Sequence, residues 1–240
     1  MSGRKLNLEP RKIATRESSV EIFDIQEIEK HFHDNLDNIK QKFDLFSSLK
    51  KSNKLSEAED ILRFQIVFLD SALDFFMHEI IKLGVLDIYH GSWHGKKTEK
   101  YLNLTFQMRE IESALNNWSK NNDPDDDLWL KNWVNKKFNN KTMMDFDSIK
   151  DCCNLLDIDY KKIAETIFYN KSSSTKPHDQ LKECLNKLYH RRNRIVHQSD
   201  RNRKNAQFQP IQKDEVENFI NEIEQIVSEI IKKFKLKESI

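Results

Sequence analysis

The chain has 240 residues, of which 33% are charged, yet its formal net charge at neutral pH is only +1. This length allows one ordinary domain with a real hydrophobic core, and the scarcity of glycine and proline, four of each, indicates long helices with few tight turns. The balanced charge argues against a protein that coats nucleic acid over its whole surface. No apolar run approaches the roughly 20 residues that a membrane-spanning helix needs.

Cysteine usage and the N-terminal residues bear on the cellular compartment. The three cysteines are odd in number and poorly spaced for a disulfide framework; they are Cys152, Cys153 and Cys184. No signal-peptide pattern is present at the N-terminus. We therefore expect a cytoplasmic protein in a reducing environment.

The first part of the chain predicts an arm followed by a long helix. Residues 1–20 are polar and basic without periodicity, which indicates a flexible N-terminal arm. Apolar residues then recur at intervals of three and four from Ile25 to about Leu49, the pattern of an amphipathic helix. We expect residues 21–240 to form a single helical domain with an insertion around 90–150.

The next helix is expected to be the central one of the bundle. Ser56 is a candidate N-cap, and Glu59 three residues later completes a capping box. The helix would run to Leu83 and stop at Gly84. Its middle is apolar around much of its circumference, which is typical of a helix buried among others.

The rest of the chain is also predicted to be helical. Pro177 follows a polar break over residues 172–177 and suits the first turn of a helix. Because no segment alternates with period two for long, the fold class is all-α, a bundle of about five to eight helices. The expected later elements are helices over residues 97–120, 126–138, 147–156 and 160–168, a helix from 177, a polar loop over 198–210, and a final helix over 213–236.

One short run near the C-terminus carries the residues best suited to chemistry. It reads LYHRRNRIVHQSDR and places Arg192, Asn193 and His197 within six positions. Arginine offers a permanent cation with a planar fork of donors that suits a phosphate, and histidine exchanges a proton near neutral pH. A phosphate clamp beside a proton-transfer group is the minimum equipment for cleaving RNA without a metal.

The helical wheel separates these groups. Arg192 falls within the apolar stripe of its helix, where a charged side chain needs a partner or an interface. His197 lies about 140° from Arg192 around an ideal helix, whereas Asn193 shares a face with His197 one turn earlier. Either the helix bends or ends near Val196, or a second copy of the chain completes the site across a two-fold axis. Both arrangements are compatible with a catalytic cleft.

The same run is rich in cations. Within fourteen positions only Asp200 opposes six basic residues: Arg191, Arg192, Arg194, Arg201, Arg203 and Lys204. A basic strip on an otherwise balanced surface would attract RNA phosphates, so the five cations beside Arg192 are candidate RNA-binding residues. The alternative interpretation is an ordinary solvated face.

The motif resembles one found in a known superfamily. The run from Arg192 to His197 resembles the R-x4-6-H motif of HEPN domains, in which a polar residue, often Asn, follows the Arg. Its continuation to Arg201 resembles the RiboL-PSP group in particular, and the segment from Phe68 to Ile81 is similar to that group's long early helix. The resemblance implies an all-helical homodimer that cleaves single-stranded RNA without a metal, leaving 2′,3′-cyclic phosphate and 5′-OH ends. It also implies a toxin or a phage-defence effector.

The resemblance further implies a role for each residue of the motif. His197 would transfer a proton or position the 2′-OH, and Arg192 would hold the scissile phosphate and stabilise the charge of the transition state. Asn193 would orient His197 or the phosphate. Asp74 and Glu79 on the central helix are candidates to pair with Arg192 or to orient His197, although the simpler interpretation of each is a surface carboxylate.

The expected partners are RNA, a second copy of the chain, and an inhibitory or activating protein. HEPN toxins silenced by a nucleotidyltransferase carry Tyr two residues after the His; Ser199 stands there in this chain, which argues against control by adenylylation. No cofactor or metal is expected, because the pairs His31/His33 and His90/His94 lack a third ligand nearby. The alternatives to an enzyme are a non-catalytic HEPN-like module that binds a nucleotide, RNA or a partner protein, and a helical dimerisation scaffold.

Overall fold

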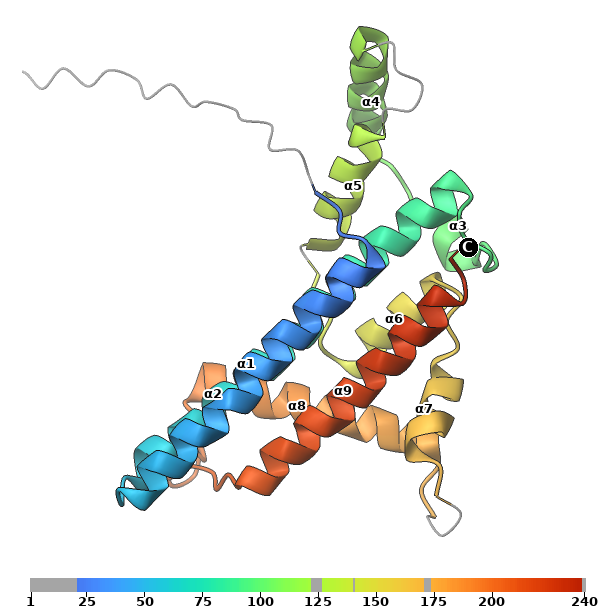
Figure 1. Ribbon diagram of the computed structural model, residues 1–240. Coiled ribbons are helices and arrows are strands. Elements are labelled where there is room, and N and C mark those ends of the chain that lie inside the picture. The colour runs from blue at the N-terminus through green and yellow to red at the C-terminus, as the bar shows by residue number, and fades with distance from the viewer. Residues whose placement is uncertain (1–20, 122–126, 140, 171–173, 239–240) are drawn as a thin grey trace, which may run out of the picture.

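The computed structural model describes residues 21–121, 127–139, 141–170 and 174–238, so the predicted arm and part of the predicted break before Pro177 lie outside the described residues. Within these ranges every regular element is a helix, and there are nine, one more than the range expected (Figure 1). The predicted all-α class is confirmed. The helices are α1 (Ile25–Lys51), α2 (Leu55–His90), α3 (Glu99–Leu102), α4 (Met108–Asn121), α5 (Leu128–Asn139), α6 (Phe146–Leu155), α7 (Tyr160–Phe168), α8 (Pro177–Gln198) and α9 (Lys213–Lys235).

The central helix is longer than predicted. α2 starts after Lys54, which makes no side-chain cap hydrogen bond, so the expected capping box at Ser56 does not begin it. The prediction that the helix stops at Gly84 is also wrong, because α2 continues to Gly91, whose φ of 80° favours glycine. Gly84 allows close packing instead: a Cβ there would lie 2.5 Å from Leu156 Cδ2.

The single helix predicted over residues 97–120 is interrupted. α3 begins at Thr98, whose side-chain oxygen accepts the N–H of Tyr101 at 3.1 Å, and it ends within four residues. α4 begins beside Gln107, whose N–H donates to Glu110 at 2.8 Å. These local caps compete with a continuous helix for the same backbone groups. Figure 1 shows α4 projecting beyond the body of the molecule, and the insertion around 90–150 stays a prediction.

The body of the molecule is organised around α2. α2 packs against α1, α5, α6, α8 and α9. α8 begins with Pro177 in its first turn, as predicted, and runs across the directions of α1 and α9 (Figure 1). α2 and α8 are in contact, so the fold sets the motif helix against the central helix.

The structure also bears on the predictions about membrane-spanning helices and cysteines. None of the helices there is long and apolar enough to cross a membrane. The three cysteines are free and buried, as expected for a chain without a disulfide framework.

Candidate active site

The three motif residues all lie on the C-terminal half of α8. The helix continues through His197 and ends at Gln198, and the backbone of the following Ser199 is left-handed with a φ of 49°. α8 therefore ends two residues beyond Val196, and Arg192 and His197 both lie within it. In one copy of the chain, Arg192 and His197 leave the same helix about 140° apart.

Arg192 points toward the central helix. Its Nε lies 3.3 Å from Oδ2 of Asp70 on α2, and its Nη1 donates to Oδ1 of Asn193 at 2.9 Å. Asp70 is completely buried, whereas the side chain of Arg192 keeps 22% exposure. A carboxylate of the central helix thus pairs with Arg192, but sequence reasoning missed which one. The sequence did contain a signal: Asp70 directly follows Leu69 in a part of the helix that is apolar around much of its circumference.

Asp74 lies one turn after Asp70. Its carboxylate accepts the N–H of Met143 at 2.7 Å and faces Nε2 of His78 at 3.5 Å. Burial works against ionisation, but the His78 side chain and the Met143 N–H outweigh it and lower the pKa of Asp74. The charged form of Asp74 is therefore favoured next to Asp70.

Glu79, the second carboxylate predicted to support the motif, lies elsewhere. It follows Asp70 by nine residues, which places it on the opposite face of α2. It pairs there with Lys82 at 2.7 Å, and both residues are buried. The structure brings Asp74 toward the motif arginine but leaves Glu79 away from it.

The environment of Asp70 disfavours its charge. Burial raises the pKa of Asp70 to about 7, Arg192 acts in the opposite direction, and the negative charge of Asp74 adds to the increase. Neither carboxylate oxygen of Asp70 receives a hydrogen bond from the described residues, because Arg192 Nε approaches outside hydrogen-bond geometry. Buried carboxylates without a hydrogen bond are uncommon in folded proteins.

His197 lies on the solvent-facing side of α8. It is exposed and forms no hydrogen bond or ion pair with the described residues. Asn186, His190, Asn193 and His197 follow one another at intervals of four, three and four residues. They therefore share one face of the helix, with His197 at its C-terminal end.

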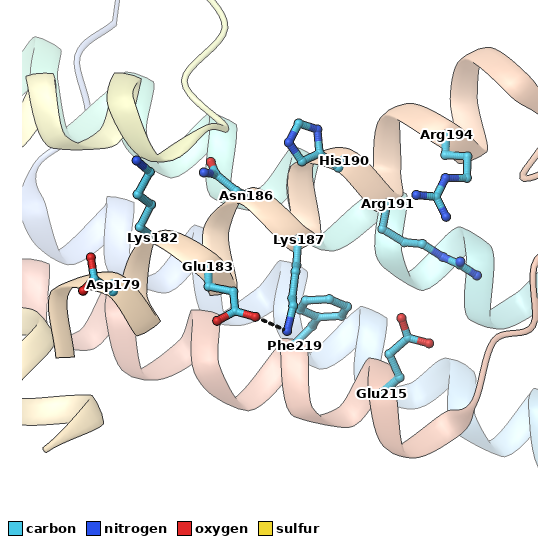
Figure 2. Close-up of a pocket in the computed structure, with 10 residues that line it drawn as sticks. All are labelled: Asp179, Lys182, Glu183, Asn186, Lys187, His190, Arg191, Arg194, Glu215 and Phe219. Atoms are coloured by element: carbon cyan, nitrogen blue, oxygen red, sulfur yellow. Dashed lines mark ion pairs between the residues drawn. The ribbon is translucent and has the colours of Figure 1, made fainter. Parts of the chain in front are cut away.

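A groove between α8 and α9 runs beside this face. Its volume is about 670 Å³. Figure 2 shows the side chains of Lys182, Asn186 and His190 on the side of α8 away from α9, while Lys187 and Arg191 lean toward α9. The sequence analysis did not find this groove, because only packing against α9 creates it. Its lining residues include Lys182, Asn186, Lys187, His190, Arg191 and Arg194 from α8, and Glu215 and Phe219 from α9.

Arg191, a predicted RNA-binding residue, is held inside the protein. Its Nη2 donates to Oδ2 of Asp200 and to the carbonyl of Pro210, at 2.9 and 3.0 Å. Nε of Arg63 on α2 donates to the same Asp200 oxygen at 2.9 Å. Asp200 is completely buried, so its carboxylate connects α2 and α8 to the loop that follows α8. We call the contacts of Asp200 with Arg63 and Arg191 the clasp.

That loop presents three of the predicted RNA-binding cations. Arg201 donates to the carbonyl of Ala206 at 2.7 Å, and its guanidinium lies 3.8 Å from the ring centroid of Phe208. Arg203 and Lys204 are exposed on the same loop. The structure thus gathers the loop cations beyond the C-terminal end of α8 and places Arg194 at the groove.

The histidine pairs considered as metal ligands have other surroundings. Nε2 of His90 lies 3.3 Å from Asp127, and the ring of His31 packs edge-on against Phe23. In the part of the chain that the structure describes, no three His, Cys, Asp or Glu side chains gather as a metal-binding group.

Comparison with known proteins identifies the family of the chain. The model of the RiboL-PSP-HEPN family matches residues 24–236, which span α1 to α9 and include the motif. HEPN domains commonly bind RNA and form dimers. Neither the curated proteins nor the solved structures contain a match to this chain.

Replacing Asp200→Ala should strongly destabilise the fold. Arg191 would stay buried without its carboxylate, and Arg63 would keep only its pairs with Glu59 and Asp60 at the surface of α2. Breaking a buried ion pair costs about 3–5 kcal/mol. Urea denaturation at neutral pH measures the loss of unfolding free energy. The control is Glu217→Ala, which removes a half-buried carboxylate paired with Lys213 at the surface and should cost no more than about 1 kcal/mol. Equal losses in the two variants would contradict the clasp.

Asp70→Asn should change how stability depends on pH. Because the folded-state pKa of Asp70 is raised from 3.8 to about 7, the folded protein holds a proton that the unfolded chain releases, and wild-type stability falls as pH rises between these values. Asparagine removes this fall. The stability of Asp70→Asn relative to wild type should therefore increase by about 2–3 kcal/mol between about pH 5 and pH 8.

Urea denaturation of both proteins across this pH range measures the difference. A constant difference between the two proteins would show that Asp70 titrates at its ordinary value.

Proposed function

Because this chain belongs to the RiboL-PSP-HEPN family, we propose that it is a metal-independent endoribonuclease that cleaves single-stranded RNA. The products would carry 2′,3′-cyclic phosphate and 5′-OH ends. The observation that supports this function most directly is the arrangement on α8: Arg192 is held by Asp70 and Asn193, while His197 is exposed one turn beyond Asn193.

The chemistry requires the 2′-oxygen to attack the adjacent phosphorus while the bond from phosphorus to the 5′-oxygen breaks. The 2′-OH loses a proton, the 5′-oxygen gains one, and negative charge builds up on the phosphoryl oxygens between these events. Arg192 would stabilise that charge with its donors. His197 would exchange a proton with one of the two oxygens, and Asn193 would orient the guanidinium that it already accepts a hydrogen bond from.

A second copy of the chain would complete the cleft. α8 continues past Val196, and Arg192 and His197 project in different directions from it, so one phosphate does not readily meet both groups in one copy. In a two-fold dimer, the cleft would hold two Arg192 and two His197 side chains. One imidazole would then accept the 2′-OH proton while the other donates to the 5′-oxygen.

The RNA strand would reach this cleft over a groove of mixed charge on one side, lined by cations and by Asp179, Glu183 and Glu215, and over a cationic loop on the other. The face of α8 that carries His190 leads along the groove to His197, and Arg194 lies at the end of the groove nearest the motif. Arg201, Arg203 and Lys204 would contact phosphates beyond the C-terminal end of α8. Arg191 would act indirectly, since its guanidinium is bound to Asp200.

The biological role that we propose is that of a toxin or phage-defence effector, kept in check or triggered by a partner protein. This role is supported by kinship with HEPN ribonucleases rather than by any single residue. Induced expression in a bacterial host should arrest growth if the role is correct, and the His197→Ala protein should not.

His197→Ala should abolish cleavage and leave the fold unchanged, because the imidazole is exposed and has no partner within the described residues. The test incubates purified protein with total RNA in the presence of EDTA, followed by chemical identification of the product ends. Wild type should give discrete cuts with 2′,3′-cyclic phosphates.

The matched control for this experiment is His94→Ala, another exposed histidine that lies beyond the far end of α2. It should cut like wild type. Cleavage that survives in His197→Ala would remove His197 from the mechanism. RNA binding without any cleavage by wild type would favour the non-catalytic binding module.

Arg192→Ala should lower the cleavage rate by about 10²–10³-fold, the usual loss when one preorganised donor to a developing charge is removed. Arg192→Lys should recover little of that rate, because an ammonium keeps the charge but not the planar fork. Initial rates on a single-stranded oligonucleotide and circular dichroism separate activity from folding. If cleavage continues at the wild-type rate in folded Arg192→Ala, the arginine is structural and the scaffold interpretation gains.

A further inference from the structure

Asp70 lies on the interior side of Arg192, and few groups around it stabilise the charge of its carboxylate. The side chain of Asp70 is completely buried, as are those of its α2 neighbours Leu69 and Leu73. Its oxygens receive no hydrogen bond from the described residues, and Arg192 Nε is its ion-pair partner at 3.3 Å. Desolvation makes such a carboxylate costly unless it is paired and hydrogen-bonded. The charge state of Asp70 therefore depends closely on what Arg192 does.

The charged groups that face Asp70 come from two helices. Arg192 approaches from α8, and Asp74 lies one turn further along α2 itself. His78 faces Asp74 rather than Asp70. Asp70 thus has one cation that favours its ionised form and one anion that disfavours it, while burial opposes ionisation throughout.

Arg192 lies where it can interact either with the Asp70 carboxylate or with an RNA phosphate. A guanidinium carries five N–H donors; one of them is used on Asn193, and the Nε edge faces Asp70. The side chain also keeps 22% exposure. An RNA phosphate that approaches the exposed edge would compete with the Asp70 carboxylate for the same positive charge.

We propose that Asp70 is a positioning residue whose protonation state sets how much of the Arg192 charge an RNA phosphate meets. Ionised Asp70 neutralises the guanidinium in an internal pair and repels the phosphate. Neutral Asp70 leaves the cation to the phosphate. This role of Asp70 rests on the proposed function of Arg192 as the group that holds the phosphate.

The direction of the pH dependence follows from the geometry. Because the pKa of Asp70 lies at about 7, both forms of the carboxyl are populated near neutral pH. RNA bound at Arg192 disfavours a second anion beside that residue, so binding takes up a proton and affinity rises as pH falls through 7. In Asp70→Asn the side chain is neutral at every pH, and this component of the pH dependence disappears.

The experiment measures binding of a single-stranded RNA in which every 2′-OH is methylated, so that no 2′-oxygen can attack. The proteins are wild type, Asp70→Asn, Arg192→Ala and the double variant, compared at constant ionic strength. Wild-type affinity should fall roughly tenfold from about pH 6 to about pH 8, the scale of one charge a few ångströms from a phosphate near the surface. Asp70→Asn should bind RNA roughly tenfold more tightly than wild type at pH 8, and the two affinities should converge toward pH 6.

The double variant shows whether Asp70 acts on RNA binding through Arg192 or only through the stability of the fold. The exposed histidines contribute equally to wild type and Asp70→Asn, so the difference between these two proteins isolates Asp70. Without Arg192, replacing Asp70→Asn should change RNA affinity much less than it does in wild type, because no guanidinium is left for Asp70 to neutralise. An equally large effect in the Arg192→Ala background, or parallel pH curves for wild type and Asp70→Asn, would overturn the proposal.

A second measurement needs no RNA. The side-chain carboxyl carbon of Asp70, followed by NMR in the free protein, should titrate with a midpoint near 7, and the midpoint should be higher in Arg192→Ala because the cation that favours ionisation is gone. A midpoint near 4 would overturn the role of Asp70, whatever the RNA does. RNA bound with the expected pH dependence but never cut would remove the nuclease function and leave Asp70 in its role; no binding by any variant would overturn both.

Discussion

Two buried carboxylates and the buried apolar face of α8 set the rotation of that helix about its own axis, and the geometry of the site follows from that rotation. Asp200 binds Arg191, and Asp70 pairs with Arg192. Successive residues of a helix point about 100° apart. Two neighbouring side chains that each bind a separate carboxylate therefore restrict the helix to one orientation about its axis. Arg63 ties the first of these anions to α2 as well. The anchors therefore connect the motif helix to the central helix of the fold.

This orientation divides the motif between the interior and the solvent. The guanidinium of Arg192 is directed toward α2, and the imidazole of His197 is directed outward. Asn193 lies between them and already bonds to Arg192. A single copy thus holds a preorganised cation and an accessible proton-transfer group that do not face each other. The division supports the proposal that a second copy completes the cleft, and HEPN domains commonly form dimers.

The charge available to RNA is smaller than the sequence indicates. Arg63 and Arg191 share the carboxylate of Asp200, and Arg192 faces Asp70. Near the motif, the cations that remain open to a phosphate lie on the loop after α8 and along the groove, where Lys187 is paired with Glu183. A protein with this distribution would hold RNA loosely over most of its surface and would concentrate its affinity near the motif. In the role proposed for Asp70, the internal neutralisation of Arg192 makes the protonation state of Asp70 part of that affinity.

The sequence by itself determined the elements and the residue types of the site. Apolar spacing gave α1, α7, α8 and α9 nearly to the residue, because a three-to-four repeat must turn one face of a helix inward. The motif of Arg192, Asn193 and His197 was likewise visible in the sequence, and the family that it indicated is the one whose model matches residues 24–236. Local signals failed at Gly84, where glycine serves contact with Leu156 rather than a helix end.

Only the tertiary structure decided which groups meet. Asp70 rather than Glu79 pairs with Arg192, and Arg191 is inside the clasp rather than on the surface. These outcomes depend on how α8 crosses α2. The crossing results from the packing of several helices together, and no spacing within one helix encodes it.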